Sequence, residues 1–160
     1  AEDIKSVEVE PYKIAAEHAH VPWDDFASAQ LSFPYLMGLA ARYRGVKFEH
    51  FDDQTRADPA FAEFARKLTV SAPAEIDQLY PKLRPARVTV TTPKGTFTRQ
   101  ADEAWGSRLV PLDDAGLIAK FLGLAGPVLG EAKAKELSER LWTVEQADDV
   151  TPLVEALAKG

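Results

Sequence analysis

An alternation of apolar and polar residues is the first pattern along this chain. Val7 and Val9 fall on one side of an extended segment, and Glu8 and Glu10 fall on the other. A period of two is typical of a half-buried strand, and it predicts a strand over residues 4–9.

Three further segments carry strand-forming residues and predict strands over residues 68–72, 87–91 and 96–101. The last two are separated by Thr92-Pro93-Lys94-Gly95, a stretch of turn-forming residues. Proline in the second position and glycine in the fourth favour a type I turn. The sequence therefore predicts a β-hairpin in the middle of the chain.

Apolar residues three and four positions apart predict five helices, over residues 33–44, 59–67, 113–125, 131–144 and 150–159. In the first, Leu36, Leu39 and Tyr43 mark a stripe that should face a core. Asp58-Pro59 supplies a cap and a first-turn proline for the second helix. Gly126-Pro127 is expected to stop the third, because proline cannot donate a helical hydrogen bond.

The order of these elements defines the expected fold class. Strands come early and in the middle of the chain, and helices lie between and after them. This order is typical of an α+β fold, here a small, mostly antiparallel sheet covered by helices on one side. A chain of 160 residues suits a single domain over residues 1–160.

Composition narrows the classes of function. The chain has 19 basic and 25 acidic residues, which gives a net charge of −6, and it has no cysteine. The negative charge argues against a nucleic-acid-binding surface, which needs a basic face. The lack of cysteine excludes disulfides, thiolate metal ligands and cysteine nucleophiles.

No apolar run approaches the roughly 20 residues that a membrane-spanning helix needs. The first residues also lack the basic-then-apolar pattern of a leader peptide. We therefore expect a cytoplasmic protein without a membrane partner.

Tyr35 is the residue that most suggests chemistry. A helical wheel places it off the Leu36–Tyr43 stripe, with Gly38 one turn on and Arg42 two turns on along the same flank. A phenol beside open space and a guanidinium could donate a hydrogen bond or a proton to an anionic substrate, since its usual pKa near 10 keeps it protonated. The other interpretation is that Tyr35 packs at a helix interface.

Other polar residues have simpler interpretations. Ser32 stands just before Phe33-Pro34 and suits the role of a helix cap. His18 and His20 could share one side of a strand as metal ligands do, but no third ligand with a recognisable spacing follows. We therefore predict no metal site.

Several of these motifs, in this order, resemble the C-terminal domain of the MmgE/PrpD family. They are the strand Ile4-Lys5-Ser6-Val7-Glu8-Val9, the stretch Ala29-Gln30-Leu31-Ser32-Phe33-Pro34-Tyr35, the hairpin around Lys94-Gly95, Gly106 with Pro111-Leu112 and Lys120-Phe121, and the ending Asp148-Asp149-Val150. The family includes 2-methylcitrate dehydratase, cis-aconitate decarboxylase and iminodisuccinate epimerase. Nearly the whole chain is covered.

The resemblance implies a lyase or isomerase of small di- or tricarboxylates that uses no cofactor. In that family a large helical N-terminal domain, absent from this chain, supplies most of the active-site groups, and the site lies between the two domains. The functional tyrosine of the family falls on Tyr35. Arg42 is a further candidate for binding a substrate carboxylate. The partners that the resemblance implies are the helical domain, a small carboxylate substrate and a second copy in a homodimer or other homo-oligomer.

Two hypotheses follow. In the first, this chain forms one wall of an interdomain active site and is inactive alone. In the second, it keeps the fold but serves as a non-catalytic interaction or dimerisation module, and Tyr35 is a packing residue.

Overall fold

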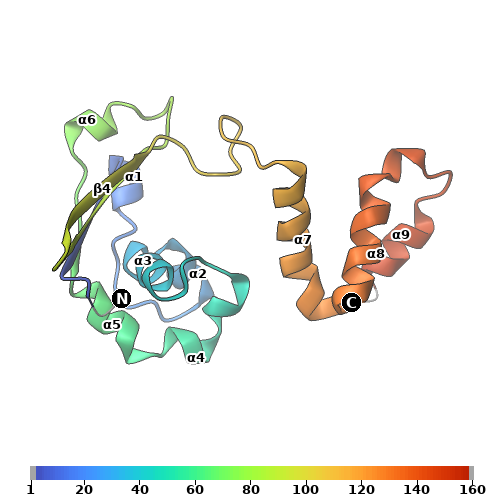
Figure 1. Cartoon of the computed structure of the whole chain (residues 1–160), viewed down its shortest axis with the longest axis horizontal. Coiled ribbons are helices and arrows are strands. Elements are labelled where there is room, and N and C mark those ends of the chain that lie inside the picture. Colours follow the sequence, from blue (N-terminus) through green and yellow to red (C-terminus); the bar gives the residue numbers. More distant parts are fainter. Residues whose placement is uncertain (1–2, 159–160) are drawn as a thin grey trace. The chain divides into compact units, whose positions relative to one another are not determined.

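The computed structural model describes residues 3–158. Its contacts divide the chain into two compact units, Ala1–Ala104 and Trp105–Gly160 (Figure 1). Residues 1–160, predicted from the sequence as a single domain, thus contain two separately packed units.

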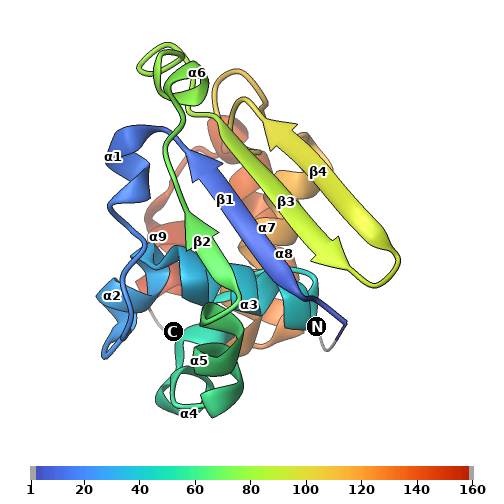
Figure 2. The same ribbon diagram turned by 90° about the vertical axis from the view of Figure 1, so that its left-hand side faces the viewer.

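The first unit is built on a four-stranded sheet in the order β2-β1-β3-β4 (Figure 2). Its strands are β1 (Ser6–Pro11), β2 (Leu68–Val70), β3 (Ala86–Thr92) and β4 (Gly95–Ala101). β1 is antiparallel to β3 and β3 to β4, whereas β1 is parallel to β2. The sheet is therefore mixed but mostly antiparallel, and the predicted α+β class is confirmed.

The predicted alternation in β1 is confirmed, because Val7 and Val9 are buried and Glu8 is exposed. The predicted hairpin is also present, with Thr92 paired to Gly95 at its closed end. β1 begins two residues later than predicted and reaches Pro11, because β3 extends back to Ala86 and supplies it with a partner.

Short helices make up the rest of the first unit: α1 (Lys13–Ala16), α2 (Phe26–Leu31), α3 (Phe33–Tyr43), the 3-10 helix η1 (Phe48–Phe51), α4 (Asp53–Arg56), α5 (Pro59–Ala65) and α6 (Ala74–Asp77). Side chains cap several of them. Asp25 accepts from the backbone of Ser28 at 2.7 Å, and Asp58 accepts from Ala60 at 2.9 Å. These caps satisfy N–H groups that have no partner within the helix.

α3 is covered on two sides, which explains why it is apolar almost throughout. Phe33, Met37 and Ala41 pack against Val7 and Val9 of the sheet. On another side of α3, Tyr35 and Leu39 join a second cluster with Trp23, Ala29 and Phe61. In Figure 1, α2 and α3 lie on one side of the sheet, whereas the helices predicted near residues 113–125, 131–144 and 150–159 to cover it belong to the second unit.

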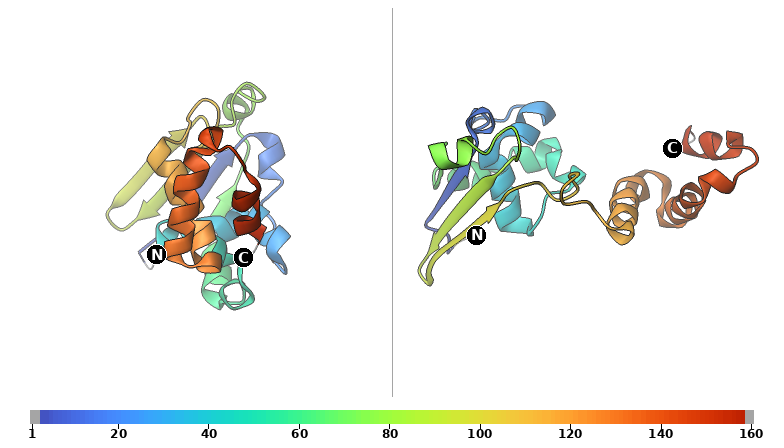
Figure 3. Two further views of the ribbon diagram at one scale, coloured as in Figure 1. Left: turned by 90° about the vertical axis from the view of Figure 1, so that its right-hand side faces the viewer. Right: turned by 90° about the horizontal axis from the view of Figure 1, so that it is seen from above.

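The second unit is helical. It contains α7 (Asp114–Leu129), α8 (Glu131–Trp142), the 3-10 helix η2 (Val144–Gln146) and α9 (Thr151–Ala158), drawn in orange to red in Figure 3. α8 packs against both α7 and α9. Its side chains Ala134, Leu137 and Ser138 are buried there.

The predicted end of α7 is wrong. The helix continues through Gly126-Pro127 to Leu129 and ends at Gly130, whose φ of 82° belongs to the left-handed region that favours glycine. Pro127 lies so close to the helix end that it removes one bond of the last turn, and the N–H of Gly130 still donates to the carbonyl of Gly126 at 2.9 Å. α8 ends two residues earlier than predicted, and the predicted end of the last helix at residue 159 lies outside the described residues.

Within residues 3–158 there is no helix with the length and apolar character that a membrane span requires.

Candidate functional site

Ser32 fixes the start of α3 and thereby the position of Tyr35. Its hydroxyl accepts from the backbone N–H of Tyr35 at 3.4 Å and donates to the carbonyl of His20 at 2.9 Å. The side chain is fully buried. The predicted capping role is confirmed, and the cap also ties α3 to the loop before α2.

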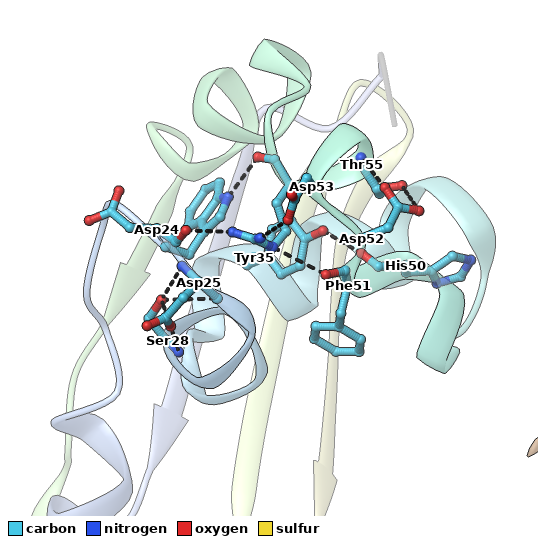
Figure 4. Close-up of polar contacts among 11 residues, drawn as sticks. Asp24, Asp25, Ser28, Tyr35, His50, Phe51, Asp52, Asp53 and Thr55 are labelled. Atoms are coloured by element: carbon cyan, nitrogen blue, oxygen red, sulfur yellow. Dashed lines mark hydrogen bonds and ion pairs between the residues drawn. The ribbon is translucent and has the colours of Figure 1, made fainter.

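Tyr35 is fully buried rather than open on one flank. Its ring packs against Trp23, Phe51 and Phe61, with centroid distances of 5.0, 6.0 and 5.2 Å. Its hydroxyl donates to the carbonyl of His50 at 2.5 Å (Figure 4). Burial raises the pKa of the Tyr35 phenol to about 12, so this group is a neutral donor and not a base at ordinary pH.

The predicted open space beside Tyr35 is absent, because side chains of the neighbouring helix α5 occupy the space next to Gly38. A Cβ atom on Gly38 would lie 2.9 Å from Cδ1 of Phe61 and 3.4 Å from Cδ1 of Phe64. The absent side chain lets α5 approach α3 closely. The Tyr35–Gly38–Leu39 side of α3 is therefore a buried face, while Tyr43 of the predicted stripe is 44% exposed.

Arg42 lies two turns after Tyr35, but its charge is directed elsewhere. Its Nη1 pairs with Oδ2 of Asp58 at 2.7 Å, and its guanidinium lies over the rings of Tyr43 and Phe61. The backbone of Ala60 and then Arg42 hold the pKa of the Asp58 carboxyl below its usual range. The structure thus gives Arg42 a carboxylate partner within the chain, and it gives Tyr35 and Arg42 different polar partners.

His50 contacts both Tyr43 and Tyr35 of α3. Its ring is buried, stacks on Tyr43 at 4.4 Å and accepts from the backbone N–H of Lys47 at 3.1 Å. Its carbonyl is the acceptor for Tyr35. His50 is therefore part of the wall around the tyrosine.

Arg56 is a residue of this region that the sequence analysis missed. Its guanidinium donates to the carbonyl of Asp24 at 2.6 Å and to that of Phe51 at 3.1 Å, and it pairs with Asp53 (Figure 4). Its own carbonyl accepts from Nε1 of Trp23 at 3.1 Å. The Asp53–Arg56 spacing of three residues was a signal for the ion pair, but the two backbone contacts depend on tertiary structure.

A surface groove of about 480 Å³ lies beside Arg56. Its lining includes three carboxylate residues, Asp24, Asp53 and Asp58, and one cationic residue, Arg56. This lining is net negative, and a di- or tricarboxylate would be repelled by it. Trp23 lines the groove and packs on the ring of Tyr35, but Tyr35 itself is not part of the lining.

The two histidines of the H-x-H motif have separate roles. Nε2 of His20 lies 2.8 Å from the carbonyl of Ser28, and the rings of His18 and His20 lie 6.4 Å apart. Among residues 3–158, no three side chains of the metal-binding types are grouped so that they could hold an ion.

The sequence model of the MmgE/PrpD C-terminal domain matches residues 1–145. The chain therefore belongs to the MmgE/PrpD family and contains its C-terminal domain. The match ends within η2, so the Asp148-Asp149-Val150 ending lies outside it.

Two curated relatives carry the name cis-aconitate decarboxylase. One is from Aspergillus terreus (strain NIH 2624 / FGSC A1156) and is 30% identical over 133 residues. The other, from Aspergillus terreus, is 30% identical over 134 residues. Each alignment covers 81% of this chain and 27% of the relative, so the chain spans about a quarter of the length of these proteins.

Proposed function

We propose that this chain is the C-terminal part of a decarboxylase of cis-aconitate or a closely related small carboxylate. The observation that carries the proposal is the family match over residues 1–145 together with two cis-aconitate decarboxylases at 30% identity. Dehydration and epimerisation, which other members of the family catalyse, are the neighbouring reactions to test.

We further propose that the active site is completed by a separate helical domain of a longer protein. The net negative groove beside Arg56 suits a tricarboxylate poorly, and Tyr35 is enclosed by aromatic side chains. A chain that corresponds to about a quarter of its relatives supplies one wall of such a site. The 160-residue chain alone should therefore be inactive.

The chemistry proposed for Tyr35 follows from its protonation state. When a carboxylate leaves as carbon dioxide, the bonding electron pair stays on the substrate and delocalises before a carbon takes up a proton. A neutral phenol can stabilise the resulting negative charge by donating a hydrogen bond. Because the Tyr35 hydroxyl now donates to the His50 carbonyl, a substrate oxygen must replace that carbonyl as the acceptor during catalysis.

Arg42 has a secondary place in the proposal. It can orient a substrate carboxylate only if its ion pair with Asp58 opens, since that pair occupies its Nη1. The base that takes or returns the substrate proton would come from the helical domain.

The second candidate function is a non-catalytic interaction module. It is favoured by one observation: the Tyr35 hydroxyl already has a buried partner, which is what a packing residue needs.

The test is Tyr35→Phe in the longer protein, with Tyr80→Phe as the matched control. Both changes remove one phenolic hydroxyl, and Tyr80 stacks on Tyr12 at a ring-centroid distance of 4.6 Å. With cis-aconitate as substrate, we expect Tyr35→Phe to lower kcat on the order of 10²-fold and Tyr80→Phe to leave it within about 2-fold.

The same assay, extended to methylcitrate and iminodisuccinate, identifies the reaction. Turnover of any of these acids by the 160-residue chain alone would contradict the two-domain site. A longer protein that turns over none of them would favour the interaction module.

A further inference from the structure

We propose that Arg56 is the positioning residue of Tyr35: it ties together the two segments whose side chains enclose the phenol. The inference rests on the proposed function for its effect on catalysis, since it concerns the same tyrosine. Its structural part, that Arg56 fixes where the ring lies, can be tested separately.

The guanidinium of Arg56 is placed where an arginine can act as a clamp. The side chain is 13% exposed, although it follows the 98% exposed Asp53 by only three residues. Its Nη1 donates to the Asp24 carbonyl at 2.6 Å, and its Nε donates to the Phe51 carbonyl at 3.1 Å. The side chain therefore bridges the segment before α2 and the segment between η1 and α4.

A third contact closes this bridge through the backbone. The indole N–H of Trp23 donates to the carbonyl of Arg56 at 3.1 Å. One residue thus contacts the Trp23–Asp24 segment through both its side chain and its backbone. These two residues are 32 and 33 positions away in sequence, so local structure alone does not hold them.

The two bridged segments supply two of the three aromatic rings that pack on Tyr35, and Phe61 of α5 supplies the third. Trp23 and Phe51 pack on its ring at 5.0 and 6.0 Å. His50, next to Phe51, supplies the acceptor for its hydroxyl. If the bridge is lost, the walls are free to separate and both the ring and its hydroxyl acceptor lose their fixed positions.

The charge of Arg56 acts on the same phenol. It works against burial, which is the main reason that the pKa of Tyr35 is raised. A partly buried cation near the hydroxyl favours negative charge there, and it would stabilise charge that develops on a substrate oxygen at this position.

Lysine cannot reproduce these contacts. The planar guanidinium presents donors in a rigid fork, so Nε and Nη1 can address two carbonyls in different directions. An ammonium is a point charge on a flexible stem. Arg56→Lys therefore keeps the charge and removes the bridge, which makes it the informative substitution.

The structural experiment uses the longer protein labelled with 3-fluorotyrosine. The ¹⁹F resonance of Tyr35 is identified as the signal that disappears from the spectrum of the Tyr35→Phe variant. We expect Arg56→Lys to shift or broaden this resonance. The matched control is Arg87→Lys, which also loses a two-pronged contact, to Glu10 at 2.6 and 2.8 Å, but in the sheet; it should leave the resonance in place.

The kinetic experiment uses the same variants and the double variant Tyr35→Phe/Arg56→Lys. We expect Arg56→Lys to lower kcat on the order of 10-fold to 100-fold, with KM within about 2-fold. If Arg56 acts through Tyr35, the substitution has little further effect once the hydroxyl is gone. Arg87→Lys should leave kcat unchanged.

Two results would overturn the proposal. One is a Tyr35 resonance that Arg56→Lys moves no more than Arg87→Lys does. The other is an equal loss of kcat from Arg56→Lys with and without the Tyr35 hydroxyl, because Arg56 would then act independently. If Arg56→Lys does not fold, Arg56→Gln, which keeps one planar amide donor, is measured in its place by the same criteria.

The result for Tyr35→Phe separates this proposal from the proposed function. Wild-type kcat in Tyr35→Phe would refute the catalytic role of the tyrosine, whereas a shifted Tyr35 resonance in Arg56→Lys would still support the positioning role of Arg56.

Discussion

The contact between α3 and α5 depends on one residue without a side chain. Gly38 of α3 faces Phe61 and Phe64 of α5, and the two phenylalanine rings occupy the space that a Cβ atom would need. Both rings are almost completely buried. They therefore have little room to move aside.

We predict that Gly38→Ala destabilises the protein despite the better helix propensity of alanine. Alanine gains up to about 1 kcal/mol in a helix, but overpacking a core costs about 1–3 kcal/mol. The matched control is Gly123→Ala in α7, where a Cβ atom meets nothing within 4 Å and the change should stabilise. Urea unfolding followed by circular dichroism measures both, and an equal gain from the two substitutions would contradict this view of the α3–α5 contact.

The apolar periodicity of α3 predicted the positions of some of its residues correctly and of others wrongly. Leu39 was correctly placed in the core, and Ser32 was correctly given a capping role. Tyr35 was placed off the buried stripe, because nearly every side of this helix is apolar and a wheel cannot choose among several covered sides. The partners of Tyr35, Trp23 and Phe61, come from segments that only the tertiary structure brings together.

An ion-pair network centred on Arg87 joins three elements of the first unit, β1, β3 and α6. Nε and Nη2 of Arg87 in β3 contact Glu10 of β1 at 2.6 and 2.8 Å, and Nη2 also contacts Glu75 of α6 at 3.0 Å. The hydrogen bonds from Arg87 lower the pKa of the Glu10 carboxyl below its ordinary value of 4.5. A depressed pKa means that the ionised form is the one that stabilises the fold.

We predict that this contribution is present at neutral pH and lost in acid. It should be complete above pH 4.5, the ordinary value for the unfolded chain, and should disappear as the pH falls through the lowered pKa of Glu10 in the folded state. The difference in unfolding free energy between wild type and Glu10→Gln should therefore shrink as the pH is lowered. Urea unfolding at several pH values measures it, with the exposed Glu8→Gln on the same strand as control; a difference that does not change with pH would contradict the prediction.

α7 continues through a proline at which the sequence predicts that the helix should end. Pro127 lies inside the helix, where proline is usually unfavourable by about 3 kcal/mol. We predict that Pro127→Ala stabilises the second unit by about 1–3 kcal/mol. Pro59→Ala is the control, because Pro59 is exposed and lies in the first turn of α5, where a missing N–H costs nothing. If Pro127→Ala does not raise the thermal midpoint, the prediction is contradicted and Pro127 is tolerated in α7 without strain.

The strands were easier to predict than the helix ends. Alternation in β1 and turn residues between β3 and β4 are local signals, and both elements are present. The parallel pairing of β1 with β2 has no local signal, because it joins residues about 60 positions apart. The continuation of α7 past Gly126-Pro127 was also missed, since a proline near a helix end removes only one bond.

For the molecule as a whole, the second unit leaves many large apolar side chains exposed: Leu117, Leu124, Val128, Trp142, Val150, Val154 and Leu157. Exposed apolar groups in this number are typical of surfaces that another protein surface covers. A unit of this size can bury only a small core of its own.

We predict that the 160-residue chain self-associates through these side chains. Analytical ultracentrifugation over a range of concentrations should show species heavier than the 17.6 kDa monomer. Val128→Glu should weaken the association, because Val128 is 68% exposed on α7, whereas Ala119→Glu adds the same charge at a small exposed residue of that helix. A chain that stays monomeric at high concentration would contradict the prediction.

The sheet of the first unit also has a consequence for the time that folding takes during synthesis. β1 lies at the centre of the sheet, yet it is made before either of its neighbours, and Ser6 finds Thr91 roughly 85 residues later in the chain. At a ribosomal rate of about 5–20 residues per second, that interval is about 4–17 seconds. Throughout this time Val7 and Val9 have no strand to pair with on that side, so this apolar segment is one that a chaperone on the nascent chain would protect.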